Sequence, residues 1–517
     1  MTSSWPPAFA AAVYAALQRR LPPAANSAAL EQLSQDLVDA LESGQLSLPL
    51  TTEREDLARS SGWLEGESSP LLIQADRIGW RRWLEAMQCV VDQLLARRLP
   101  DRPAAEPAQP CSANLNANQR AAVLAMDQWP VVLLSGGPGT GKTSTVVELL
   151  QRVCQRHPGL RIGLAAPTGK AARRLGDAVR PQFSGLPCFT LHRWLEAAGE
   201  GFRRNRDRPL ELDLLVIDEM SMVDLALMSA VLESLPDECR LLLVGDPAQL
   251  PPVGSGSVWQ QLQDPAVREH FGAGAIHLSH TYRNRGALAV LATALREEGA
   301  AGFRRELQGL PADANVQHQW ASLRRLPAGV RQSWTHRHQH LKALAKGLLD
   351  APDEALAQSA AALFDDLETT LLLCPRRRGP WSLEDVHRTL LGPDVCRDPM
   401  RWPEGIPVIC GGNQPELGLA NGDLGVKLGR GHGGCVLFQV IDTDGQTRMR
   451  RFNPARLNVL EPALALTIHR AQGSEADAVT VLWPQGLGLD NAYERSLLYT
   501  AITRARVSLN LISEDAV

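Results

Sequence analysis

The chain has 517 residues, of which 44% are hydrophobic and 21% charged, and its formal net charge is −4. This is the composition of an ordinary soluble globular protein, and the length predicts three or four domains rather than one core. No apolar run approaches the roughly 20 residues needed to cross a bilayer, and the N-terminus lacks the basic start and apolar core of a secretory signal, so we expect a cytoplasmic protein without a membrane partner.

The nine cysteines are scattered singly, and no C-x-x-C pair occurs among them. This spacing gives no signal for a zinc site or a thiol redox centre. Small buried apolar residues are the expected role of these cysteines in a reducing compartment.

The first hundred residues have a helix-rich pattern that breaks at Pro22 and Pro23. Residues 100–110 hold four prolines, a composition that suits neither a helix nor an inner strand. We therefore predict a helix-rich N-terminal domain over residues 1–110 that ends in a linker.

From residue 111 to about 300, short apolar runs alternate with helical patterns. Four continuous runs are each soon followed by Gly, Ser, Pro or Asp, at 131–134, 162–165, 214–217 and 241–244. Such runs are typical of buried parallel strands, so we predict a doubly wound α/β unit with ligands at the carboxyl ends of its strands.

The remaining sequence, 301–517, changes texture twice. It is mostly helical to about 400, with a predicted strand at 371–373, and then becomes rich in glycine and in short alternating segments over 403–460. That middle stretch predicts a small antiparallel barrel-like insert. The α/β texture resumes after Glu461, with predicted strands at 479–482 and 507–512.

A phosphate-binding loop lies between a predicted strand and a predicted helix. It satisfies G-x-x-x-x-G-K-T and consists of Gly136, Gly137, Pro138, Gly139, Thr140, Gly141, Lys142 and Thr143, with Ser144 opening the helix. The glycines let backbone N–H groups curve around phosphates at the positive end of the helix. We expect ATP here, with Lys142 on its β- and γ-phosphates and Thr143 as a ligand of Mg²⁺.

The complementary half of the phosphoryl-transfer site follows the run at 214–217. Asp218 can hold Mg²⁺, and Glu219 can activate water as a general base. A third strand end, after residue 244, carries Gln249 as a candidate sensor of the γ-phosphate. Together these residues predict hydrolysis of ATP as well as binding.

These residues, in this order, resemble the motifs of superfamily 1 helicases. The resemblance implies that Gln119 recognises adenine, that Arg283 reaches the γ-phosphate and that Arg504 is an arginine finger from a second lobe. It also implies single-stranded DNA contacts within the segments 166–172, 190–193, 421–423 and 467–475, at Pro167, Thr168, Thr190, His192, Asn421, Thr467, His469 and Gln472.

Within that superfamily the chain most resembles the RecD subunits of exodeoxyribonuclease V, the RecBCD enzyme. The resemblance rests on Asn421-Gly422-Asp423, on residues 70–83 and on the short leader before the motor. It implies two RecA-like P-loop NTPase lobes (111–300 and 301–517), 5′ to 3′ translocation at duplex ends, and RecB-like and RecC-like partners that contact residues 1–110. No carboxylate and lysine cluster beyond Asp218 and Glu219 is present, so a nuclease centre is expected on a partner chain. Two alternatives remain. One is a stand-alone helicase of the same superfamily, because the segment Pro251-Pro252-Val253-Gly254 resembles such helicases more closely than it resembles the RecD pattern. The other is a scaffold subunit with little ATPase activity.

Several further side chains have two interpretations. Trp194 and Trp259 could stack on bases or lie in the core, and Trp63, Trp80 and Trp83 suit the core or a partner interface. His336, His338 and His340 favour a polar surface helix over a metal site. The arginine clusters at 203–208 and 376–378 favour solvated loops over DNA contacts.

Overall fold

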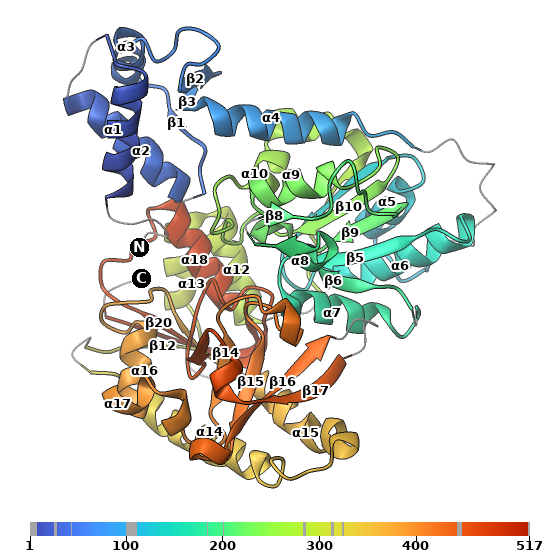
Figure 1. Cartoon of the computed structure of the whole chain (residues 1–517), viewed down its shortest axis with the longest axis vertical. Helices are drawn as coiled ribbons and strands as arrows, with labels where there is room; N and C mark the ends of the chain where they lie inside the picture. The colour runs from blue at the N-terminus through green and yellow to red at the C-terminus, as the bar shows by residue number, and fades with distance from the viewer. Residues whose placement is uncertain are drawn as a thin grey trace.

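The computed structural model describes residues 8–24, 28–42, 44–99, 111–183, 185–199, 201–282, 286–311, 315–322, 325–441 and 447–514. The proline-rich segment 100–110 and the predicted γ-phosphate contact Arg283 lie outside the described residues. Figure 1 shows the N-terminal elements at the upper left, a first α/β unit at the right and a second α/β unit below it.

The N-terminal segment combines helices with a small antiparallel sheet of order β1-β3-β2. Its elements are α1 (Phe9–Arg20), α2 (Ala28–Glu42), β1 (Ser47–Pro49), α3 (Thr52–Ser60), β2 (Leu71–Gln74) and β3 (Arg77–Trp80). They enclose a hydrophobic cluster of their own, which includes Tyr14, Trp63 and Trp80. The following helix α4 (Arg81–Leu95) buries Met87, Val90, Val91 and Leu94 in the core of the first α/β unit.

The first α/β unit has a six-stranded parallel sheet of order β11-β4-β10-β9-β5-β6. All four predicted runs are strands in it. The strands are β4 (Val131–Gly136), β5 (Ile162–Ala166), β6 (Cys188–Thr190), β9 (Leu214–Ile217), β10 (Arg240–Gly245) and β11 (Ala275–Leu278). Hydrophobic clusters cover both faces, with α5 (Ala117–Ala125), α6 (Lys142–Arg156) and α7 (Gly169–Val179) on one face and α9 (Leu225–Glu233) and α10 (Val258–Gln263) on the other.

The second α/β unit has a five-stranded parallel sheet of order β12-β21-β20-β13-β19. Its strands are β12 (Val316–Trp320), β13 (Thr370–Cys374), β19 (Leu466–Thr467), β20 (Ala476–Trp483) and β21 (Ala505–Ser513), which confirms the strands predicted at 371–373, 479–482 and 507–512. Around it lie α12 (Ala287–Glu297), α13 (Gly299–Gln308), α16 (Leu383–Leu391) and α18 (Ala492–Ile502), whereas α15 (Asp353–Leu367) and the C-terminal half of α14 (Ala328–Ala345) pack against the strands inserted between β13 and β19. The predicted boundary between residues 300 and 301 falls inside α13.

A five-stranded antiparallel sheet of order β17-β16-β15-β14-β18 interrupts the second unit between β13 and β19. Its strands are β14 (Pro407–Cys410), β15 (Leu424–Leu428), β16 (Cys435–Ile441), β17 (Thr447–Phe452) and β18 (Leu460–Pro462). The alternating sequence at 403–460 therefore forms antiparallel strands. In Figure 1 these strands face α7 of the first unit.

Candidate active site

The phosphate-binding loop joins β4 to α6, as predicted. Gly139 and Gly141 have φ values of +72° and +83°, a conformation that favours glycine. A side chain at Gly141 would also meet Gln119 Nε2 at 2.5 Å. Lys142 Nζ donates hydrogen bonds to the carbonyl oxygens of Gly136 (2.7 Å) and Gly137 (3.0 Å), so its ammonium group lies inside the loop.

Asp218 and Glu219 follow β9 at the carboxyl end of the sheet. Burial, together with the neighbouring Glu219 carboxylate, raises the pKa of Asp218 to about 6. A cation at this carboxyl group would offset both effects, since opposite charge favours ionisation. The backbone of Glu219 is left-handed (φ +56°, ψ +44°), a region that a glutamate rarely adopts.

The strain at Glu219 gives a stability prediction. Glu219→Gly and Glu219→Ala both remove the carboxylate, but only glycine adopts this φ without steric cost. We expect the glycine variant to be the more stable by about 1 kcal/mol, measured as a higher midpoint in thermal or denaturant unfolding. Equal midpoints would mean that the backbone relaxes when the side chain is removed.

Gln249 lies on a loop that the second unit holds in place. Tyr499 donates its hydroxyl to Asp246 Oδ2 at 3.1 Å, and the Leu250 amide donates to Thr500 Oγ1 at 2.9 Å. Gln249 itself is 5% exposed, and its Oε1 is buried with no hydrogen-bond partner among the described residues. An unpaired buried oxygen beside the phosphate loop suits a ligand that brings a donor, such as an attacking water.

Arg504 supplies the second unit's side of the site. It is 3% exposed, and its guanidinium donates to the carbonyl oxygens of Thr500 (3.0 Å) and Ser474 (3.2 Å). These hydrogen bonds fix the side chain where α18 meets β21.

One cavity of about 430 Å³ brings these groups together. Most of the predicted ATP-site residues line it: Pro138, Gly139, Gly141, Lys142, Thr143, Ser144, Asp218, Glu219, Gln249 and Arg504. The wall holds one ammonium group, two guanidinium groups and three carboxylates, and a glycine-rich turn lies at a helix N-terminus. This donor set fits a nucleotide triphosphate with a divalent cation.

Some predicted residues lie behind the cavity wall. Gly136, Gly137 and Thr140 are inner parts of the loop. Gln119 is 4% exposed and donates to the Thr140 carbonyl at 3.3 Å, so in this structure its amide supports the loop. It also accepts a hydrogen bond from the Tyr282 hydroxyl at 3.1 Å.

Arg174, Tyr282 and Glu475 also line the cavity, and the sequence did not predict them as site residues. Glu475 ends the segment 467–475 and Tyr282 precedes the predicted γ-phosphate contact Arg283, but no local pattern distinguishes either residue from its neighbours. Arg174 lies on the second turn of α7, whose polar residues have no spacing that signals a site. Their common property is position, because each comes to the cavity from a different element.

A second cavity, of about 840 Å³, lies between the two α/β units. Most of the predicted DNA contacts line it: Pro167, Thr168, His192, Asn421, Thr467, His469 and Gln472. Thr190 instead lines an adjoining cavity of about 610 Å³, which shares His192 with the first. We call the 840 Å³ cavity the interlobe groove.

Two groove residues have their polar atoms engaged. Gln472 Nε2 donates to the Leu250 carbonyl at 3.2 Å and so links the two units. His469 Nε2 and the Tyr493 hydroxyl are 2.9 Å apart, and burial lowers the pKa of His469 to about 4. His469 is therefore neutral at neutral pH and would contact a nucleic acid by hydrogen bonding rather than by charge.

Comparisons with known proteins agree with this arrangement. Two family models match: an AAA domain over residues 119–255 and a UvrD-like helicase C-terminal domain over residues 462–512. The RecBCD enzyme subunit RecD of Mycolicibacterium smegmatis is 34% identical over 84% of this chain and 78% of that protein. The protein of the same name from Mycobacterium tuberculosis is 34% identical over 88% of this chain and 80% of its own length. The chain belongs to the RecD family.

Other comparisons of this chain gave a longer protein and, at lower identity, a solved structure. The ATP-dependent RecD2 DNA helicase of Deinococcus radiodurans is 32% identical over 73% of this chain, but the match covers only 46% of that protein. A crystal structure of Bacteroides Pif1 bound to single-stranded DNA covers 78% of this RecD-family chain and 93% of its own, with 16% identity and a TM-score of 0.45.

For most of the tryptophan, histidine and arginine side chains that had two interpretations, the structure distinguishes between them. Trp259 is fully buried, and Trp194 packs against the same core while donating to the Leu164 carbonyl at 2.8 Å, so both have core positions. The alternating histidines lie on helix α14, as predicted. Arg376 and Arg377 lie in a loop, as predicted, and this loop borders the interlobe groove. Arg204 and Arg208 instead pair with Glu196 near the surface.

Within the described ranges, no helix combines the length and apolar character required to cross a bilayer.

Proposed function

We propose that this chain is the ATP-driven DNA helicase subunit of a RecBCD-type complex, and that it moves 5′ to 3′ along one strand at a duplex end. The observation that carries the proposal is the position of residues 467–475. Thr467, His469 and Gln472 line the interlobe groove, whereas Glu475 lines the ATP cavity. One short segment thus contacts both sites, as a motor that couples hydrolysis to strand movement requires.

ATP hydrolysis would use residues of both units. Lys142 binds the phosphates, and Glu219 orients the attacking water and takes its proton. Arg504 stabilises the charge that develops on the transferred phosphoryl group. Mg²⁺, held by Thr143 and Asp218, would neutralise phosphate charge when bound. We assign both units as RecA-like lobes whose closure brings Arg504 to the nucleotide.

The strand would lie in the interlobe groove, held by phosphate contacts and stacking rather than by base recognition. Thr168 at the start of α7 and Thr467 come from opposite units and offer hydroxyl donors. Arg376 and Arg377, which are adjacent in the sequence, also line this groove and add positive charge to it. We propose that all the predicted DNA contacts act here, with Thr190 and His192 continuing the path into the adjoining cavity.

Assembly with RecB-like and RecC-like chains is proposed from the relatives, whose names make them subunits of the RecBCD enzyme. We assign residues 1–110 to partner binding, since the elements from α1 to β3 enclose a hydrophobic cluster of their own, while α4 packs on the first unit. The antiparallel sheet over 407–462 is assigned as a small barrel-type insert. We propose that the nuclease centre lies on a partner chain and that the complex acts in the cytoplasm.

Two other functions fit less well. A scaffold subunit without ATPase activity would have no need for Lys142, Glu219 and Arg504 to meet in one cavity. A stand-alone helicase is less well supported, because the relatives named RecD match 84% and 88% of this chain and the RecD2 helicase matches 73% of it.

The proposal is tested by ATP turnover and translocation. The chain, alone and with its partner chains, should hydrolyse ATP faster with single-stranded DNA than without. It should displace streptavidin from a 3′-biotinylated oligonucleotide in preference to a 5′-biotinylated one. If single-stranded DNA does not stimulate ATP hydrolysis in any assembly, the motor function is refuted. Preferred displacement of streptavidin from the 5′-biotinylated oligonucleotide would refute the 5′ to 3′ polarity.

Tyr282 is the one aromatic side chain on the wall of the ATP cavity, within the described part of the chain, and it is 47% exposed. We expect it to stack on the base. Because such stacking is worth about 1–3 kcal/mol, Tyr282→Ala should raise the KM for ATP about tenfold or more with little change in kcat. Tyr282→Phe keeps the ring and should keep the KM within about threefold. A similar rise for both would assign the effect to the hydroxyl contact with Gln119.

A further inference from the structure

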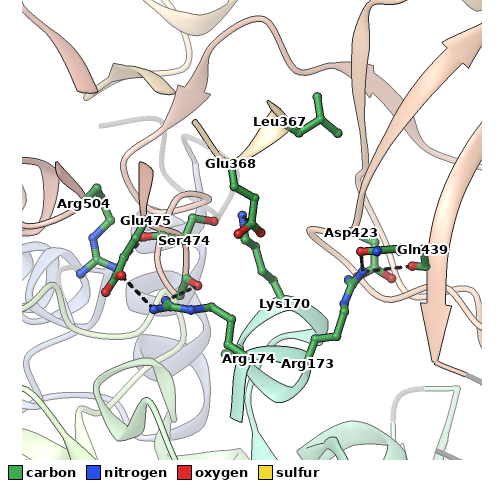
Figure 2. Close-up of polar contacts among 12 residues, drawn as sticks. Lys170, Arg173, Arg174, Leu367, Glu368, Asp423, Gln439, Ser474, Glu475 and Arg504 are labelled. Carbon is green, nitrogen blue, oxygen red and sulfur yellow. Dashed lines mark hydrogen bonds and ion pairs between the residues drawn. The ribbon is translucent and has the colours of Figure 1, made fainter. Parts of the chain in front are cut away.

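Helix α7 presents three cations to the second half of the chain. Lys170, Arg173 and Arg174 are spaced i, i+3 and i+4, so they share one side of the helix. Each pairs with a different segment, as Figure 2 shows: Lys170 with Glu368 (3.1 Å), Arg173 with Asp423 (3.0 Å) and Arg174 with Glu475 (3.0 Å). The contacts join the first α/β unit to the second unit and to its antiparallel insert.

The backbones approach closely at the same place. A Cβ at Gly169 would lie 2.6 Å from Asp423 Oδ1. A Cβ at Gly473 would lie 3.3 Å from Ala171 Cβ and 3.4 Å from Thr168 Oγ1, and Gly473 has a φ of +72°. The first turn of α7 therefore packs directly on residue 473, and a side chain there would separate the two units.

Arg174 differs from the other two cations because it lines the ATP cavity. Its guanidinium binds Glu475 Oε2 and also donates to the Gly473 carbonyl at 3.0 Å. Glu475 is 12% exposed and lines the same cavity. Arg173, by contrast, binds Asp423 and the Gln439 side chain, away from that cavity.

Residues 473–475 are thereby held from both sides. Arg174 binds Gly473 and Glu475 from the first unit, while Arg504 donates to the Ser474 carbonyl from the second. Figure 2 shows Ser474 and Glu475 between the two arginine side chains. The position of Arg504 relative to the phosphate loop therefore depends on a three-residue bridge whose other end is Arg174.

We propose that Arg174 is a positioning residue for ATP hydrolysis, which holds the 473–475 bridge so that Arg504 faces the nucleotide. The inference deepens the proposed function and rests on it. Thr168, at the N-cap of the same helix, lines the interlobe groove. A strand in the groove and the bridge at the ATP cavity thus contact one rigid helix less than two turns apart.

The test separates chemistry from binding. Arg174→Ala should lower kcat for DNA-stimulated hydrolysis about 10- to 100-fold, while the KM for ATP and the Kd for DNA stay within about threefold. A direct phosphate contact would instead raise the KM for ATP. Arg174→Lys keeps the charge near Glu475 but cannot make both contacts with fork geometry, so it should recover part of the lost kcat.

Arg173→Ala is the matched control. It removes the same charge and one ion pair between the units from the same side of α7, without altering the ATP cavity wall. Its kcat should fall clearly less than that of Arg174→Ala. Equal losses of kcat in the two variants would overturn the inference, because the effect would then come only from weaker attachment of the two units to each other.

A double-mutant cycle tests whether Arg174 acts through Glu475. If it does, Glu475→Gln combined with Arg174→Ala should have a kcat within about twofold of the lower single variant. Independent losses that multiply would overturn the inference. Melting curves that match the wild type show that the variants fold. If Arg174→Ala does not fold, Arg174→Lys and Glu475→Gln are measured in its place. If both of these variants keep the wild-type kcat, the inference is overturned.

The two proposals fail differently. A wild-type chain without DNA-stimulated hydrolysis in any assembly would refute the proposed function and, with it, this inference. A wild type that hydrolyses ATP, with Arg174→Ala equal to it in kcat, would refute the inference alone.

Discussion

Replacing Arg504 with alanine is expected to lower kcat for DNA-stimulated ATP hydrolysis by about 10³-fold or more, since arginine fingers contribute about 10³- to 10⁵-fold to such reactions. The guanidinium lies on the cavity wall, held by the Thr500 and Ser474 carbonyls. The measurement is steady-state turnover at saturating ATP and DNA, paired with nucleotide binding. Binding should persist, because the phosphate loop on the first unit is intact.

Arg495→Ala provides the control for Arg504. Arg495 lies on the same helix, α18, and its side chain donates to the carbonyl oxygens of Leu489 and Asp490 outside the ATP cavity. Its turnover should stay near that of the wild type. If Arg504→Ala retained more than about a tenth of wild-type turnover, the finger assignment would be refuted.

The second large effect is expected at the phosphate loop. Lys142→Gln should reduce hydrolysis by about 10²- to 10³-fold or abolish it, because the variant loses the positive charge that stabilises the phosphates in the transition state. Partner assembly should be intact, since residue 142 lies far along the chain from the N-terminal cluster. Pull-down of partner chains and ATP turnover, measured on one preparation, give both results.

Lys346→Gln, at an exposed lysine beside α14, controls for the loss of a charge. Unchanged ATP turnover in Lys142→Gln would refute the assignment of the ATP site. Loss of partner assembly in the same variant would mean that the loop also stabilises the fold.

The strands and the phosphate loop could be predicted because their signals are local. A run such as 214–217 is continuous and apolar since both faces of its sheet are buried, and the carboxylates that follow must then lie at the strand end. The loop glycines could be predicted for the same reason, as only glycine adopts φ values near those of Gly139 and Gly141 without cost.

Contacts between distant segments could not be predicted. Arg174 and Glu475 are separated by about 300 residues, and neither lies in a pattern that specifies the other. The contact of the Gln119 amide with the Thr140 carbonyl could not be predicted either, because a buried amide binds whichever backbone groups lie nearest. The boundary predicted between residues 300 and 301 falls inside α13, because the sequence is helical on both sides of it.

The segment 467–475 has a thermodynamic consequence. Because it borders both cavities, any shift of it that ATP stabilises must alter the affinity of the groove for DNA. Linkage makes that effect reciprocal: the factor by which bound DNA changes the affinity for ATP equals the factor by which bound ATP changes the affinity for DNA. The two dissociation constants, each measured with and without the other ligand under non-hydrolysing conditions, form a closed cycle whose single coupling free energy is the equilibrium basis of the motor's step.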